Sequence, residues 1–431
     1  MSDEARGVSA VGSLRAPSAG ESPVSAIERI DSLDVLRGFA VLGILVMNIQ
    51  SFAMVGSAYM NPKSWGDLSG VNGIIWHASH VLADSKFMTL FSILFGAGIV
   101  LVSGRRQSAG KSPAALHFRR MLGLLGIGLI HAYLFWYGDI LVPYAVCGSV
   151  VFVVWSLRAR WLVLGSMSLL IIGALSILAI GFSLGFMPEK DHQEMQDTVW
   201  APTPEEIDKE LAIYRGPWLP QLAHRAETTI MIQTVGLFML GWRITGLMLL
   251  GMALLKTGFL SGRSANRTYI CVLVFGCLIG FPMVTWGIAR NEAANWSMNF
   301  SMFSGTLPNY FASILIALAY VAAIQLLLRS ATRRTLVDWL APVGRMALTN
   351  YLTQTLICTL LFYGHGLALF GSVNRLQQLM IVVAIWVFQI LFSKFWMARF
   401  RFGPCEYAWR AMTYLKLPSE PVPATSNRLA S

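Results

Sequence analysis

Long apolar runs recur along this chain, and they constrain its fold more than any other feature. A helix needs about 20 apolar residues to cross the hydrocarbon of a bilayer. Only 13% of the 431 residues are charged and 55% are hydrophobic, whereas soluble domains carry about 25% charged residues. We therefore predict an all-α integral membrane protein of about ten transmembrane helices. The predicted spans are 36–56, 86–104, 120–137, 140–157, 161–186, 230–255, 268–289, 308–328, 346–362 and 377–396.

Lys and Arg residues are unevenly distributed among the segments between these spans. With both termini on the cytoplasmic side, the inner segments hold 24 of them and the outer segments hold 7. Basic residues concentrate in cytoplasmic loops, so this split predicts an N-in, C-in topology. The same orientation explains the net charge of +11, and no nucleic-acid partner is expected.

One long outer segment divides the predicted spans into two membrane halves, 30–186 and 230–416. That segment, 187–229, is acidic and extracytoplasmic, and it is either a lid over an outer cavity or a solvated connector. Residues 1–29 lack the apolar core of a signal peptide and are predicted to be a disordered cytoplasmic tail, as are residues 417–431. The five cysteines form no CxxC pair, so neither a disulfide framework nor a cysteine metal site is expected.

Polar residues inside the first and third spans are the first candidates for function, because such groups are costly in a bilayer. Asn48 follows Arg37 by eleven residues, and His131 follows Arg120 by the same interval. Both are therefore predicted at one depth, about 16 Å from the inner interface. His131 could be a base or an acyl carrier, or a buried histidine bonded to a neighbouring helix. Asp139 lies about 12 Å beyond His131 in a straight helix, too far for a direct pair.

Three further polar residues lie within later spans. Asn350 and Gln354 share one helix face, where amides either hold transmembrane helices together or contribute to a site. Arg243 is a charge inside the sixth span, where it is expected to face a cavity or an anion, or to extend to the interface.

The sequence offers no convincing metal or nucleotide motif. His77, His80 and Asp84 have a spacing that could bind a metal, but an amphipathic interfacial helix explains them better, and no metal is predicted. The chain has no Walker loop and no GxGxxG after a strand.

Five motifs in order along the chain resemble those of the YeiB family of multi-pass membrane proteins. They occupy 33–49, 90–98, 130–141, 344–354 and 402–410. The resemblance extends from about residue 30 to about residue 416. It implies a bacterial inner (plasma) membrane protein with both termini in the cytoplasm.

That family is similar to a wider group of transmembrane acyltransferases. The group shares an Arg-Gly opening on its first helix and an Asn or His eleven residues after the Arg, and Arg37 and Asn48 match this placement. The sequence around the essential histidine of that group is matched only in part by residues 77–79. The catalytic role is therefore assigned to His131. The resemblance implies transfer of an acyl (acetyl) group from cytosolic acyl-CoA, a co-substrate and not a tightly bound cofactor, to an envelope glycan or lipid.

The candidate site residues follow from these arguments and from the family motifs. The catalytic candidates are His131, Asn48 and Asp139. The candidates for binding substrate or co-substrate are Arg37, Arg105, Arg106, Arg243, Arg345, Asn350, Gln354, Glu406 and Arg410. Two alternatives stay open: a transporter or flippase for an amphipathic or anionic solute, and a non-catalytic membrane scaffold. The expected partners are the bilayer, a small-molecule or glycan or lipid substrate, and a second copy of the chain in a homodimer.

Overall fold

The computed structural model describes residues 26–415, and all regular structure in that part of the chain is helical. The elements, with short π or 3-10 segments marked η, are α1 (Ala26–Ala53), α2 (Ser57–Met60), α3 (Gly70–Leu82), α4 (Lys86–Ser108), α5 (Ala114–Ile130), η1 (His131–Phe135), α6 (Leu141–Val151), η2 (Phe152–Val154), α7 (Ala159–Ser183), η3 (Leu184–Phe186), α8 (Glu189–Met195), η4 (Gln196–Trp200), α9 (Pro204–Arg215), α10 (Trp218–Met231), η5 (Ile232–Gly236), α11 (Leu237–Lys256), α12 (Asn266–Phe275), η6 (Gly276–Gly280), α13 (Phe281–Ala293), α14 (Met298–Ser301), η7 (Ser304–Thr306), α15 (Leu307–Leu327), α16 (Arg333–Arg345), α17 (Ala347–Phe362), α18 (Arg375–Met397) and α19 (Pro404–Tyr414).

The length and outward face of these helices define a membrane protein. Within the described residues, eight helical segments are long and apolar enough to cross a membrane, and Leu141–Val154 and Ala347–Phe362 are shorter apolar helices at two further predicted spans. Large apolar side chains point outward, as Phe182 and Leu278 do at 74% and 70% exposure. Lipid solvates such a surface, and helices satisfy their own backbone polar groups there. The predicted all-α membrane class is confirmed.

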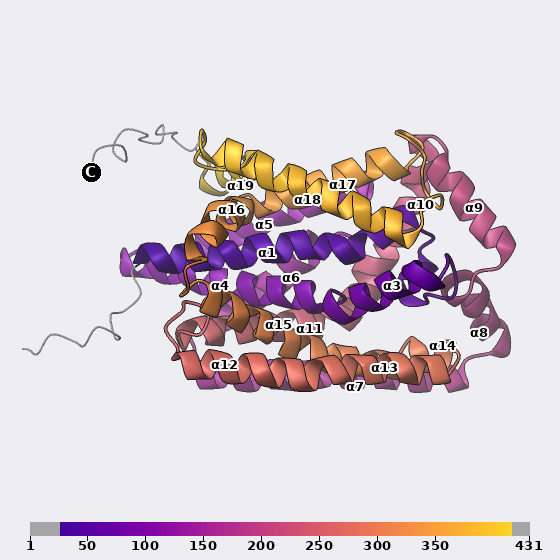
Figure 1. Cartoon of the computed structure of the whole chain (residues 1–431), viewed down its shortest axis with the longest axis horizontal. Coiled ribbons are helices and arrows are strands. Elements are labelled where there is room, and N and C mark those ends of the chain that lie inside the picture. Colours follow the sequence, from indigo (N-terminus) through magenta and orange to yellow (C-terminus); the bar gives the residue numbers. More distant parts are fainter. Residues whose placement is uncertain (1–25, 416–431) are drawn as a thin grey trace, which may run out of the picture.

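The helices lie roughly parallel, with α1 near the middle of the bundle (Figure 1). The start of α1 and the final helix α19 lie at one end of the bundle, whereas α8 and α9 lie at the other end. The predicted tails, 1–29 and 417–431, fall outside the described residues except for 26–29, which belong to α1. Both ends of the described chain therefore lie at the same end of the bundle.

The contact between α4 and α11 depends on small residues. A Cβ atom on Gly96 of α4 would lie 2.0 Å from the Met248 carbonyl oxygen, and one on Gly251 of α11 would lie 1.8 Å from that of Ile93. Only glycine permits backbones to approach this closely. The two helices thus contact each other backbone to backbone.

The outer segment 187–229 is mostly helical and packs onto the bundle. Helix α9 begins with Thr203 as its N-cap and Pro204 in its first turn, both favourable at these positions. Trp200 is buried, and its indole N–H donates to the Trp296 carbonyl at 2.7 Å. Helix α10 continues through η5 into α11, so the helix predicted at 230–255 already begins at Trp218.

Candidate functional site

The third predicted membrane helix is broken near its C-terminal end. Helix α5 passes at His131 into the π segment η1, where the Trp136 N–H donates to the His131 carbonyl at 2.9 Å. Trp136 then adopts an extended backbone, with φ −158° and ψ 124°, which ends the helix. A Cβ on Gly138 would lie 2.3 Å from the Trp136 ring, so glycine is required for the chain to turn back under that ring. The chain reverses within these few residues.

This reversal brings Asp139 back onto His131. Asp139 Oδ1 lies 2.7 Å from His131 Nδ1, and Asp139 Oδ2 accepts the Val142 backbone N–H at 2.7 Å. The predicted separation of about 12 Å is wrong, because it assumed a straight helix. Asp139 lies at the N-terminus of α6, where the helix dipole and a backbone donor stabilise a carboxylate.

Thr355 of α17 completes a chain of three side chains. Its hydroxyl lies 2.9 Å from His131 Nε2, on the opposite edge of the ring from Asp139. A carboxylate can only accept, so the proton is assigned to His131 Nδ1, and Nε2 then accepts from the Thr355 hydroxyl. His131, Asp139 and Thr355 are 2%, 7% and 2% exposed, so protein atoms shield them from solvent. We refer to these three residues as the triad.

Aromatic rings surround the imidazole. The Tyr351 ring lies 5.2 Å from that of His131, and the Trp136 ring lies 6.2 Å from it. Phe52 of α1 stacks on Trp136 at 4.2 Å, and the Tyr351 hydroxyl accepts the Ile140 N–H at 3.3 Å. Electrostatic interactions are stronger in such an apolar enclosure than in water.

Side chains from α10 bind the carbonyls of the π segment. Thr229 donates to the Ala132 carbonyl at 3.2 Å, and Arg225 donates to the Leu134 carbonyl. Buried carbonyl groups need such partners, because no water reaches them in the bilayer. The end of the outer segment therefore stabilises the distorted backbone that positions the triad.

A second polar group lies on the first half of α17. It consists of side chains from α17 and α18, and we call it the amide cluster: Asn350, Gln354, Gln389 and Ser393. Gln389 donates to the Asn350 carbonyl at 2.7 Å and accepts from Gln354 at 2.9 Å. Gln354 also donates to the Val41 carbonyl at 3.1 Å, and Asn350 donates to Ser393 at 3.0 Å. These bonds join α1, α17 and α18, so both predicted amides hold helices together.

Glu406 of the last helix binds the start of α17. Its carboxylate accepts the Leu348 and Thr349 backbone N–H groups at 2.7 and 3.1 Å and the Thr349 hydroxyl at 2.5 Å. Free N–H groups at a helix N-terminus favour a carboxylate. Arg410, one turn further, lies 4.2 Å over the Phe402 ring. The motif at 402–410 thus anchors α19 on α17.

Arg243 contacts neither the triad nor the amide cluster. It is buried on α11 and donates to the Tyr310 carbonyl at 2.7 Å, to Thr89 at 3.1 Å and to Ser313 at 2.7 Å. Its guanidinium also lies 4.2 Å over the Tyr310 ring. This charge is held by neutral groups of α4 and α15.

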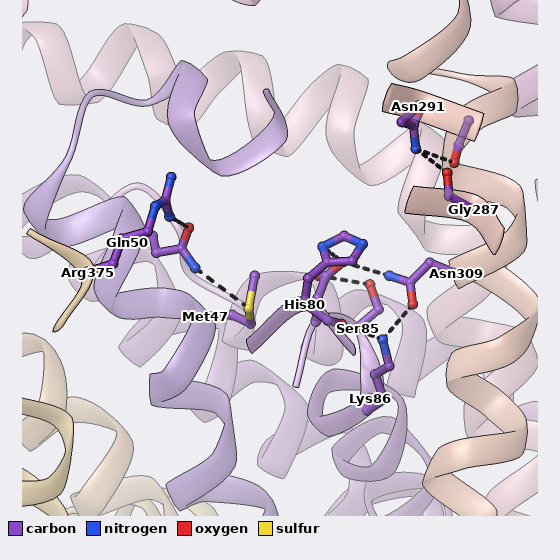
Figure 2. Close-up of polar contacts among 11 residues, drawn as sticks. Met47, Gln50, His80, Ser85, Lys86, Gly287, Asn291, Asn309 and Arg375 are labelled. Carbon is purple, nitrogen blue, oxygen red and sulfur yellow. Dashed lines mark hydrogen bonds and ion pairs between the residues drawn. The ribbon is translucent and has the colours of Figure 1, made fainter. Parts of the chain in front are cut away.

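A further buried cation lies at the start of α4. Lys86 donates to the His80 carbonyl at 2.8 Å and to the Asn309 side chain at 2.6 Å. Asn309 in turn donates to Asp84 at 2.6 Å, and His80 Nδ1 lies 3.4 Å from Asp84 (Figure 2). The stretch that contains His80 and Asp84, predicted to be an interfacial helix, therefore contributes to a cluster of acidic and basic side chains between α3, α4 and α15.

The remaining predicted residues are not brought to the triad. Asn48 is half-buried on α1, and its side chain forms no hydrogen bond within residues 26–415. Arg37 pairs with Asp34 at 3.0 Å near the start of α1. Arg105 and Arg106 end α4, and Arg345 ends α16, at the same end of the bundle as α19 (Figure 1).

Two contributors to the site were absent from the sequence-based prediction. Thr355 is one of several threonines on its helix, and nothing in the spacing separates it from Thr349 or Thr353. Arg225 falls within the predicted outer loop, so its burial beside η1 was not expected. A charged residue at the apolar end of that loop was the available signal for Arg225, since membrane helices rarely carry such a charge without a partner.

The bundle and its buried triad define a polytopic helical membrane protein with an acid–base group in its interior. The chain belongs to the YeiB family. It is 32% identical over 401 residues to the uncharacterized protein YeiB of Escherichia coli (strain K12), covering 90% of this chain and 97% of that protein. It is 29% identical over 415 residues to the uncharacterized protein YxaH of Bacillus subtilis (strain 168), covering 91% and 96%. A family described as "Protein of unknown function (DUF418)" matches residues 254–416.

Proposed function

We propose that this protein is a transmembrane acyltransferase that moves an acyl group from acyl-CoA to a hydroxyl or amine acceptor in the cell envelope. The observation that carries the proposal is the triad, in which a hydroxyl, an imidazole and a carboxylate are joined by bonds of 2.9 and 2.7 Å. This is the arrangement that activates a nucleophile: a base bonded to the hydroxyl, and a third group that orients the base.

The chemistry assigned to each residue follows from this order. Thr355 Oγ1 attacks the thioester carbonyl while its proton passes to His131 Nε2, and Asp139 stabilises the imidazolium. Collapse of the tetrahedral intermediate breaks the C–S bond, and His131 protonates the departing CoA thiolate. The acceptor then attacks the Thr355 ester, gives its proton to His131, and leaves with the acyl group. Thr355 finally regains its proton from His131.

The distribution of charge supports a cytosolic donor and an outer acceptor. Arg105, Arg106 and Arg345 lie at the end of the bundle that holds α19, where guanidinium groups suit the phosphates of CoA. The same segments carry an excess of basic residues. This supports placing this end of the bundle, and both termini, on the cytoplasmic side of a bacterial inner membrane. The triad lies towards the other end, because His131 follows the start of α5 by about 25 Å of helix.

Transport of an anionic or amphipathic solute is the second candidate. The specific observation in its favour is the pair of buried cations on α4 and α11, Lys86 and Arg243, which are held mainly by neutral groups. Intramembrane cations of this kind commonly line solute or proton pathways.

Acyl transfer by the purified protein tests the first candidate. Full-length protein is incubated with labelled acetyl-CoA and extracted envelope glycans and lipids, and label is followed on protein and acceptor. We expect Thr355→Val and His131→Ala to lose at least about a hundredfold in transfer, and Thr355→Ser to retain it. Thr353→Val is the matched control, because the Thr353 hydroxyl bonds only the Thr349 carbonyl in its own helix.

Two results would contradict this function. One is the absence of CoA-dependent transfer to any acceptor. The other is equal transfer by the Thr355→Val, His131→Ala and Thr353→Val variants. Solute flux into vesicles that requires Arg243 or Lys86 would favour the transporter instead.

A further inference from the structure

A groove opens on the surface of the bundle between α3 and α13. Its volume is about 880 Å³, which is within the range of pockets that hold small ligands. Its walls are accessible from outside, because Ile74 and Leu82 of α3 line it and are 69% and 49% exposed. The triad residues are not among those that line it, so the groove is a separate feature of the molecule.

Each wall of the groove is one face of a helix. The lining residues of α3 from Ile74 onwards, and those of α13 from Thr285 onwards, follow the pattern i, i+3, i+4, i+7, which places each set on one face. Ala78 and Ala289 belong to these faces, and both are exposed. Their methyl side chains are too short to fill the space, so it stays open between the helices.

The groove lies towards one surface of the bilayer. Helices α12 and α13 form one continuous segment, Asn266–Ala293, that is long and apolar enough to cross a membrane, and it ends near α14 at the end of the bundle that holds α8 and α9 (Figure 1). Glu292 follows Asn266 by about 39 Å of helix, whereas the hydrocarbon is about 30 Å thick, so Glu292 belongs at headgroup level. Thr285 lies about 10 Å closer to the bilayer centre. The groove therefore extends from the headgroups into the acyl chains.

Both signs of charge are present at the headgroup end of the groove. Glu292 Oε2 lies 2.8 Å from Lys63 Nζ, and Oε1 accepts the Trp296 indole N–H at 2.8 Å. The side chains of Lys63 and Glu292 are 42% and 41% exposed, so a ligand can reach both. Each carboxylate oxygen has a second lone pair and the ammonium has three N–H donors, so this ion pair alone does not saturate either group.

His77 adds an uncharged acceptor to the same groove. Its Nδ1 lies 2.8 Å from the Gly73 carbonyl oxygen, which can only accept, so Nδ1 is assigned the proton of the neutral ring. Nε2 is then an acceptor on an exposed side chain that lines the groove. With Glu292 on the other wall, the groove presents two acceptors, one of which is anionic.

These groups match a zwitterionic amine headgroup. A primary ammonium donates up to three hydrogen bonds, which suits Glu292 and His77, and the adjoining phosphate is anionic, which suits Lys63. A trimethylammonium headgroup has no N–H to donate, and an anionic glycerol headgroup brings no cation to Glu292. The apolar part of the groove suits an acyl chain of the same molecule.

We propose that the groove between α3 and α13 is a binding site for one phospholipid with a primary amine headgroup, phosphatidylethanolamine. Its ammonium binds Glu292 and His77, its phosphate binds Lys63, and one acyl chain lies along Val81 and Ile288. This binding does not depend on acyl transfer at the triad, and it is measured without an acyl donor.

Native mass spectrometry of the full-length protein, freed of lipid in neutral detergent, tests the site. Phosphatidylethanolamine, phosphatidylcholine and phosphatidylglycerol with identical acyl chains are titrated separately, and the apparent affinity for the first bound lipid is measured. We expect phosphatidylethanolamine to bind about three- to tenfold more tightly than the other two, because bonds to partly exposed charges contribute modestly. Glu292→Gln should remove most of this preference and leave the affinity for phosphatidylcholine unchanged.

Two tryptophan variants control the measurement. Ala78→Trp fills the groove from an exposed position and should weaken phosphatidylethanolamine binding by about tenfold or more. Ala384→Trp makes the same change on the exposed side of α18 and should leave binding unchanged.

Three results would overturn the proposal. Equal affinity of the wild-type protein for all three lipids is expected of lipid that coats the bundle without recognition of its headgroup. Wild-type affinity in Ala78→Trp would place the bound lipid elsewhere. A dimer that Ala78→Trp dissociates would show that a second copy of the chain occupies the groove.

Discussion

Helix α17 carries two polar groups that differ in how their hydrogen bonds are used. In the amide cluster, Gln389 and Gln354 bind backbone carbonyls and each other, and these bonds join neighbouring helices. In the triad, the three side chains bind each other in a line, from carboxylate to imidazole to hydroxyl. The amide cluster contains only amides and a hydroxyl, whereas the triad contains an imidazole and a carboxylate.

This difference shows that a polar residue in a membrane helix is not by itself evidence for chemistry. Amides that bind carbonyls of neighbouring helices stabilise the bundle and have no proton to transfer. An imidazole that a carboxylate orients towards a hydroxyl can accept and return a proton. The two groups should therefore respond differently to substitution.

The largest effect is expected at Asp139. Asp139→Ala leaves the imidazole and the Val142 N–H without their partner, which should lower the free energy of unfolding by about 3–5 kcal/mol. Asp139→Asn retains the volume but cannot stabilise an imidazolium, so transfer should fall by about 10³-fold or more. Unfolding in mixed detergent and the acyl-transfer assay measure the two effects. Transfer at the wild-type rate by a folded Asp139→Asn variant would refute the orienting role.

A smaller effect, confined to stability, is expected in the amide cluster. Gln389→Leu removes the bonds to Asn350 and Gln354, and interhelical bonds of this kind contribute about 0.6–2 kcal/mol each. The free energy of unfolding should fall by about 1–2 kcal/mol while the transfer rate per folded molecule stays unchanged. Phe388→Leu, on the outward side of α18, is the control. If the acyl-transfer rate of Gln389→Leu falls by more than its amount of folded protein, the amide cluster also contributes to transfer. The proposed difference between the two groups is then wrong.

An effect on pH dependence, and not on transfer, is expected outside the membrane, at Glu210 of α9. Burial raises the pKa of Glu210 from 4.5 to about 7, although its bond from the Gly56 N–H acts in the opposite direction. The folded state therefore binds a proton more readily than the unfolded state between these values. Stability should fall as pH rises from 4.5 to 7, and it should recover as pH falls.

Thermal unfolding across that interval measures the dependence on Glu210. Glu210→Gln should flatten the profile, whereas Glu205→Gln, at an exposed position of the same helix, should leave it unchanged. If the slope survives in the Glu210→Gln variant, another group is responsible for the titration.

The sequence predicted the helical membrane class well, because apolar runs and charge asymmetry report directly on the bilayer. The sequence also identified His131 and Asp139 as polar residues whose position in the membrane requires a structural or functional explanation. Their contact was not predictable from helical geometry, since it depends on a π segment and on the extended backbone of Trp136. The carbonyl groups of this distorted segment accept hydrogen bonds from side chains of α10, which lies far away in the sequence.

Thr355 illustrates a second limit. A threonine in a membrane helix normally bonds the carbonyl one turn earlier, as Thr353 does, and its hydroxyl is then occupied. Thr355 instead faces an imidazole from a helix more than 200 residues earlier in the chain. No local pattern distinguishes these two cases, because the partner is set by tertiary contacts.

The π segment η1 has a consequence for how this site could arise or be lost. A π turn places one more residue in a helical turn than an α-helix does, so it is equivalent to a single inserted residue. Deleting one residue from 132–135 would move the point where the chain leaves the helix by about 100° around the axis of α5. Asp139 would then no longer meet His131, although every polar residue of the triad would still be present. The pairing of Asp139 with His131 thus depends on the number of residues between them as well as on their identities.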